Sequence, residues 1–104
     1  MDIAELTGRI CSIGVYPSAK LIYITIYAED FEATESGEKV SILLPKNTQN
    51  LLVISDLLKF QISHVKFTII KSSKKKKTTN FGEIIDQFNA TRIELICERS
   101  KLIQ

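Results

Sequence analysis

The stretch that decides the fold class is LIYITIY, residues 21–27. Isoleucine occupies every second position from Ile22, and Tyr23, Thr25 and Tyr27 occupy the positions between the isoleucines. Alternate side chains of a strand point to opposite faces of a sheet, whereas a helix would scatter the three isoleucines around its axis. The stretch is therefore predicted to be a strand with an apolar inner face and an outer face that carries two tyrosines.

The segments on either side of this stretch are also predicted to be strands. Residues 6–16 are rich in Ile, Val, Thr and Cys and contain Gly8 and Gly14, which indicates a strand that is bent or bulged at its glycines. Residues 38–44 alternate in the same way as residues 21–29, and the acidic segment 30–37 is expected to be the loop between them. Together these segments predict a sheet of three consecutive strands.

A helix is predicted next, because the pattern of apolar residues changes. Pro45 ends the third strand, and Asn47-Thr48 offers an N-cap. Leucine and isoleucine then recur at mixed spacings of three and four over residues 51–58, which is typical of an amphipathic helix of about three turns.

The last third of the chain is predicted to add two strands separated by a loop. Residues 65–71 alternate as a strand, and residues 91–98 do so again. Between them the polar, lysine-rich segment at about 72–82 is expected to be a long mobile loop, and residues 83–88 are expected to form a short helical turn.

Composition limits the function classes. With 104 residues, 44 % apolar and 25 % charged, the chain has the size and composition of a single globular domain, residues 1–104. The acidic N-terminus lacks the features of a signal peptide, and no apolar run approaches the ~18 residues of a membrane span. We therefore expect an intracellular protein, cytoplasmic or nuclear, without a membrane association.

The sequence offers little for catalysis or metal binding. Cys11 and Cys97 lie far apart and are expected to be small buried residues, and His64, the one histidine, is expected to be a strand-end residue. Motifs for phosphate cradles, paired carboxylates and nucleophilic triads are missing from the sequence. We expect neither an enzyme nor a cofactor.

The order strand, strand, strand, helix, strand, strand resembles that of the OB-fold, an all-β, five-stranded Greek-key barrel with one helix between strands three and four. Residues 5–10, ELTGRI, resemble the first strand of the bacterial single-stranded-DNA-binding protein and primosomal replication protein B group, and residues 90–96, ATRIELI, are similar to its last strand. The sequence differs from the bacterial single-stranded-DNA-binding proteins at residues 60–64, FQISH, where their glycine-rich approach to the fourth strand would lie, and residues 99–104, RSKLIQ, do not resemble their acidic tail.

The resemblance implies a nucleic-acid groove on strands two and three, between the first hairpin loop and the loop after strand four. The candidate binding residues are the aromatic, hydroxyl and lysine side chains on or near these elements: Tyr16, Lys20, Tyr23, Thr25, Tyr27, Lys39, Ser41, Lys66, Lys74, Lys75, Lys76, Lys77 and Phe81. Tyrosine rings can stack on unpaired bases for ~1–3 kcal/mol each, and lysines neutralise phosphates.

Each of these features also has a simpler interpretation. Tyr23 and Tyr27 equally suit ordinary sheet packing or a protein contact, and Phe81 equally suits an anchor of its loop on the barrel. Phe31, in the acidic loop, suits a protein contact, while Phe60, Phe67 and Phe88 are expected in the core.

Charge is distributed unevenly along the chain. Residues 1–45 hold three basic and seven acidic residues, a net charge of −4, whereas residues 46–104 hold eleven basic and five acidic residues, a net charge of +6. Positive charge concentrated in this way favours a polyanionic partner, although the lysine run equally suits a solvated loop tip or a nuclear-localisation-like patch.

The leading hypothesis is a protein that binds single-stranded nucleic acid, with DNA favoured over RNA, largely without sequence specificity. It would act in replication, recombination, repair or end protection, as a homo-oligomer or a subunit of a larger complex. The alternative is a small OB-fold subunit that contacts proteins within a nucleic-acid-processing complex. Its contact surface would then be formed by apolar residues that strand alternation or chain-end position leaves partly outside the core: Leu43, Ile70, Ile96, Leu102 and Ile103.

Overall fold

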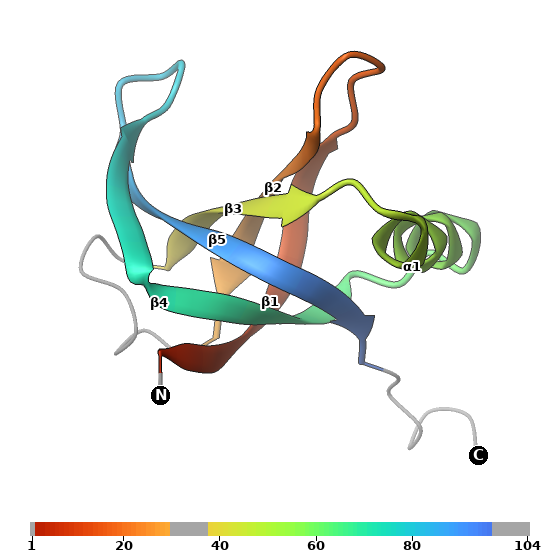
Figure 1. The fold of residues 1–104 in the computed structure, drawn as a ribbon. Coiled ribbons are helices and arrows are strands. Elements are labelled where there is room, and N and C mark those ends of the chain that lie inside the picture. Colours follow the sequence, from red (N-terminus) through yellow and green to blue (C-terminus); the bar gives the residue numbers. More distant parts are fainter. Residues whose placement is uncertain (1, 30–37, 97–104) are drawn as a thin grey trace.

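The computed structural model describes residues 2–29 and 38–96, which form five strands and one helix. The elements are β1 (Ile3–Gly14), β2 (Leu21–Ala28), β3 (Lys39–Pro45), α1 (Thr48–Lys59), β4 (His64–Thr78) and β5 (Ile84–Leu95). The strands close into a barrel in the order β1-β2-β3-β5-β4, with the helix inserted between β3 and β4 (Figure 1). The predicted OB-fold-like barrel is confirmed. Predictions for the acidic loop 30–37, Phe31, Cys97, Leu102 and Ile103 lie outside the described residues.

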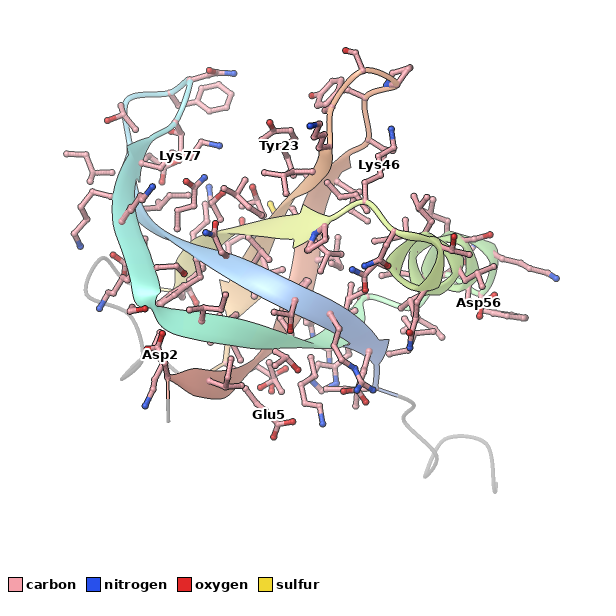
Figure 2. The ribbon with its side chains drawn as sticks, viewed as in Figure 1. Asp2, Glu5, Tyr23, Lys46, Asp56 and Lys77 are labelled. Carbon is pink, nitrogen blue, oxygen red and sulfur yellow. The ribbon has the colours of Figure 1, made fainter. Side chains whose placement is uncertain are left out.

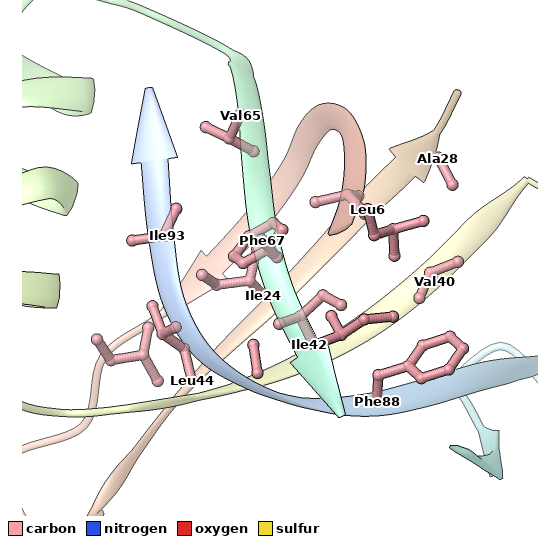
Figure 3. Packing of buried hydrophobic residues seen from close by; sticks show 14 of the residues in the cluster. Leu6, Ile24, Ala28, Val40, Ile42, Leu44, Val65, Phe67, Phe88 and Ile93 are labelled. Atoms are coloured by element: carbon pink, nitrogen blue, oxygen red, sulfur yellow. The ribbon is translucent and has the colours of Figure 1, made fainter. Parts of the chain in front are cut away.

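The barrel interior is filled by the alternating apolar residues of the strands. Ile22, Ile24 and Ile26 of β2 are at most 1 % exposed, as their spacing predicts. Side chains from all five strands meet in the interior around Phe67 of β4 (Figure 3). Phe67 and Phe88 lie in this core as expected, so the apolar alternation of the sequence corresponds to the inner surface of the barrel.

Strand β1 pairs with β2 on one side and with β4 on the other, and Gly8 lies where the two pairings overlap. Gly8 lies opposite Ala28 of β2 and opposite Val65 of β4. A Cβ at this position would stand 2.5 Å from the carbonyl oxygen of Tyr27, so only glycine permits the observed approach of the strands.

The bulge in β1 lies at Cys11, where the register with β2 shifts between Ile10 and Ser12. Cys11 is exposed, so the prediction of a buried thiol is wrong at this position. The extra residue of a bulge has no partner opposite it, and this interrupts the alternation that would bury every second side chain.

Helix α1 is fixed to the barrel by a buried asparagine. The backbone N–H of Asn50 donates to the Asn47 side chain at 2.9 Å, which confirms the N-cap. The Asn50 side-chain amide donates to the carbonyl oxygens of Pro45 at 2.9 Å and Thr91 at 3.3 Å, and so joins the helix to β3 and β5. Phe60, expected in the core, is 60 % exposed, because it follows the last helical residue and lies beyond the buried face.

The largest correction concerns residues 72–82, predicted as a mobile loop. Strand β4 continues to Thr78 and pairs with β5 from Lys75↔Gln87 to Thr78↔Ile84, so the connecting loop is only residues 79–83. The helical turn predicted at 83–88 is likewise wrong, because those residues supply the partner strand. We call residues 75–87, the paired ends of β4 and β5 with their loop, the β4–β5 arm.

The β4–β5 arm leaves the barrel at a bend in β4. Between Ile70 and Lys75 the register with β5 shifts, and β1 accompanies β4 only as far as Ile70. The bend is held by Ser73, whose hydroxyl donates to the carbonyl of Ile70 at 2.5 Å and accepts from the Asn89 N–H at 2.8 Å. The backbone N–H of Lys71 also donates to the carbonyl oxygen of Asp2, at 2.7 Å. The arm is therefore an extension of the closed barrel, in which Asp86 and Gln87 at its base still pair with β3 and the rest of the arm pairs β4 with β5.

In Figure 1 the β4–β5 arm and the β1–β2 hairpin project from the same side of the barrel, while α1 lies at a different end. No helix within residues 2–29 and 38–96 is long and apolar enough to cross a membrane.

Candidate nucleic-acid interface

A cleft of about 380 Å³ lies where β1, β2 and β3 face the β4–β5 arm. Lining side chains come from each of these elements: Cys11, Ser12, Thr25, Lys39, Lys77, Thr78, Thr79, Asn80, Phe81, Glu83 and Ile85. Figure 2 shows Tyr23 and Lys77 in the space between the two projecting hairpins. The elements that the OB-fold resemblance assigns to the groove are thus adjacent to one another.

The outer face of β2 presents its aromatic rings to solvent. Tyr23 is 39 % exposed and Tyr27 is 45 % exposed, because they alternate with the buried isoleucines. Tyr16, in the β1–β2 loop, packs edge-on against Tyr23 with ring centroids 5.9 Å apart and lies over Gly14. Two neighbouring tyrosines therefore form one aromatic surface at the β1–β2 end of this face.

Phe81 supplies a separate aromatic ring at the tip of the β4–β5 arm. The side chain is 91 % exposed, so it does not anchor the loop on the barrel. The loop is shaped by Thr79 instead, whose hydroxyl accepts from the N–H groups of Phe81 at 3.3 Å and Glu83 at 3.1 Å. Gly82 completes the turn with a φ of 83°.

Lys39 lies in the cleft between an aromatic ring and a carboxylate. Its ammonium is 5.8 Å from the centroid of the Tyr27 ring and 3.2 Å from a carboxylate oxygen of Glu83. The hydrogen bond and charge of Glu83 raise the pKa of Lys39 above its usual 10.5. Lys39 is therefore a fixed positive charge at physiological pH.

The lysine run divides between two environments, because neighbouring residues of a strand face opposite sides. Lys77 lines the cleft and Lys75 is exposed. Lys76 lies 2.8 Å from the carboxylate of Asp86, which has no solvent exposure. The run is therefore part of a paired strand, and its members differ in what they contact.

Four of the predicted binding residues line the cleft, namely Thr25, Lys39, Lys77 and Phe81, and Lys66 and Ser41 are among those that do not. Lys66 belongs to the barrel portion of β4, on the wall opposite β2 and β3, and pairs with Glu5 at 3.0 Å. Ser41 is only 2 % exposed, because the side-chain amide of Gln87 lies over it and donates to its hydroxyl at 3.1 Å. Of the remaining candidates, Lys20 is exposed on the β1–β2 loop.

The sequence reasoning missed several residues that shape the cleft. The bulge in β1 places Cys11 and Ser12 in the lining of the cleft, and no residue type in the sequence predicts a bulge at this position. Lys46 fixes the β1–β2 loop by donating from its ammonium to the carbonyl of Tyr16 at 2.7 Å. Thr79 was detectable in principle, since a threonine three residues before a glycine is typical of a turn.

His64 begins β4, as expected, and contacts the carboxylate of Glu29. In the part of the chain that the structure describes, no three His, Cys, Asp or Glu side chains gather closely enough to hold a metal ion. The cleft is lined by hydroxyl, amide, aromatic and lysine groups together with the Glu83 carboxylate, the Cys11 thiol and Ile85.

Comparisons of the chain with protein-family models, curated proteins and solved structures give no match.

Proposed function

We propose that this protein binds single-stranded nucleic acid, DNA in preference to RNA, largely without sequence specificity. The observation that carries the proposal is the cleft between the β1–β2 hairpin and the β4–β5 arm, with exposed aromatic rings beside it and lysines along its edge. Unpaired bases expose ring faces that aromatic side chains can cover, and a flexible strand can follow a groove that a duplex cannot enter.

Each group has a role in this proposal. Tyr23, Tyr27 and Phe81 provide surfaces on which bases stack. Lys75 and Lys77 neutralise phosphates from the arm, and Lys20 does so from the β1–β2 loop. Because none of these contacts depends on the edge of a base, binding tolerates different sequences.

We further propose a binding protein rather than an enzyme, located in the cytoplasm or nucleus, that acts in replication, recombination, repair or end protection. It would work as a homo-oligomer or as a subunit of a replication or repair complex. One cleft contacts few nucleotides, and several linked clefts raise the overall affinity.

The test is fluorescence anisotropy of a labelled oligo-dT of about 20 nucleotides, titrated with the protein at three salt concentrations. A duplex of the same length and an oligo-U strand serve as comparisons. Binding that prefers the single strand, weakens steeply with salt and is tighter for DNA would support the proposal. If the protein leaves the anisotropy unchanged at low salt, the proposed function is wrong.

A second candidate function, contact with a protein in a larger complex, is favoured by a different surface. Leu52, Leu58 and Phe60, in and just after α1, are each at least 60 % exposed. Large apolar side chains exposed to this extent are common at protein interfaces. Leu43, Ile70 and Ile96, which the sequence predicts to lie partly outside the core, are half-buried. The two candidates separate in the oligo-dT titration, because a subunit that only contacts proteins would leave the anisotropy unchanged at low salt, whereas strand binding by the cleft would be unaffected by Leu58→Ser.

A further inference from the structure

Within the cleft, one lysine is already paired with a carboxylate from the opposite side. Lys39 begins β3, Glu83 ends the loop of the β4–β5 arm, and their charged groups lie 3.2 Å apart. Both residues line the cleft. The pair therefore joins the barrel to the arm across the space that a strand would enter.

This pair lies beside a proposed stacking surface. The Lys39 ammonium is 5.8 Å from the Tyr27 ring centroid, so a nucleotide whose base stacks on Tyr27 brings phosphate close to Lys39. The Glu83 carboxylate is paired with the Lys39 ammonium. Because this carboxylate and a phosphate are both negatively charged, Glu83 also repels an approaching phosphate. The Glu83 carboxylate thus has two effects, since it pairs with the lysine and repels the phosphate of the ligand.

The ion pair between Lys39 and Glu83 is accessible enough for a phosphate to replace the Glu83 carboxylate. The Lys39 and Glu83 side chains are 28 % and 49 % exposed, and an ion pair in such a position contributes little to stability. Lys76 is different, because its partner Asp86 is fully buried and would lose the compensation from this ammonium if the lysine moved to a phosphate.

We infer that Glu83 is an internal competitor of phosphate at Lys39. On binding, a backbone phosphate takes the place of the Glu83 carboxylate at the Lys39 ammonium, and Glu83 thereby limits the affinity of the cleft for single strands. This inference rests on the proposed function and identifies an affinity-limiting residue of the same site.

The experiment compares Glu83→Gln with the unaltered protein in the oligo-dT titration. Glutamine keeps the size of the side chain and removes its charge. We expect the Kd at low salt to fall about three- to tenfold, because the phosphate no longer has to displace a carboxylate from Lys39. Glu83→Ala is the second variant, and thermal melting checks that both fold.

The chain offers a matched control in Glu5→Gln. Glu5 also pairs with a lysine, Lys66, at 3.0 Å, but on the wall of the barrel opposite the cleft. The net charge changes equally in the two variants, and screening by salt weakens the effect of distant charges. We expect Glu5→Gln to change the Kd by less than about twofold at moderate salt.

A double-mutant cycle with Lys39→Ala tests the exchange directly. The gain from Glu83→Gln should shrink when Lys39 is replaced, because the competitor then has no lysine to release and only its direct repulsion of phosphate remains. If the gain persists in full without Lys39, or if Glu83→Gln behaves like Glu5→Gln, the inference is overturned while single-strand binding stands. If neither the unaltered protein nor Glu83→Gln binds the strand, the inference and the proposed function both fail.

Discussion

Lys76 and Asp86 lie directly opposite each other in the β4–β5 arm, and the lysine ammonium is 2.8 Å from a carboxylate with no solvent exposure. On its other side Asp86 lies opposite Val40 of β3, so the carboxylate is buried at the junction of the arm and the barrel. A buried carboxylate needs a partner, and Lys76 supplies one from a half-exposed position. One lysine of a run that looks uniform in sequence thus has a structural role.

The first prediction concerns this pair. Lys76→Ala should lower the free energy of unfolding by about 1–3 kcal/mol, because it leaves Asp86 buried without that compensation. The measurement is urea denaturation followed by circular dichroism. Lys75→Ala is the control, since Lys75 is exposed, and should change stability by no more than about 0.5 kcal/mol. Equal midpoints for the two variants would contradict the structural role of Lys76.

The second prediction concerns the aromatic face of β2. Tyr23→Ala and Tyr27→Ala should each weaken binding to oligo-dT by about 1–3 kcal/mol, because each removes a stacking surface. Phe60→Ala is the control, since this ring is 60 % exposed but follows α1 rather than lying on β2. Anisotropy titrations of the three variants give the comparison. A loss with Phe60→Ala as large as with the tyrosines would count against the cleft as the binding site.

The third prediction concerns Lys75 and Lys77. Replacing either with alanine should reduce the slope of log affinity against log salt by about 0.7, because one phosphate contact is lost. Lys66→Ala removes the same charge from the opposite wall of the barrel and should leave the slope unchanged. The slopes are measured from titrations at several salt concentrations. Identical slopes for Lys77→Ala and Lys66→Ala would exclude the arm from phosphate binding.

The fourth prediction concerns Gly8. Gly8→Ala should destabilise the barrel by about 1–3 kcal/mol, because the added Cβ would stand 2.5 Å from the carbonyl oxygen of Tyr27. Gly82→Asn is the comparison: Gly82 has open space around it, and asparagine tolerates its φ of 83°. This second change should cost less than about 0.5 kcal/mol. Thermal melting of both variants compares their stabilities. Similar melting temperatures would show that β1 can move away from β2 to make room for the added Cβ.

The sequence predicts the barrel correctly where the local alternation of apolar residues matches the side chains that are buried. The isoleucines of residues 21–27 are all buried, and Asn47 caps α1. The sequence misleads at residues 75–78, because lysines have low strand propensity and their pairing depends on β5, reached through a turn at Thr79. Long-range pairing outweighed local preference there.

The same limit explains why two of the predicted binding residues lie away from the cleft. Ser41 has the spacing of an outward residue, yet Gln87, from a strand distant in sequence, covers it. Lys66 also points outward, but the order of strands in the barrel puts it on the far wall. Spacing indicates which side of a strand a residue occupies, whereas the contacts of that side depend on topology.

The bend at Ser73 also separates two parts of β4 whose amide hydrogens exchange with solvent by different opening motions. Amides of β4 before Ile70 lie within a closed ring of strands, so their exchange requires opening of the barrel. Those of residues 75–78 lie in a segment that pairs with β5 alone within the described residues, so separation of two strands is enough to release them. One continuous strand should therefore exchange at two distinct rates, and a ligand held in the cleft would slow the faster one.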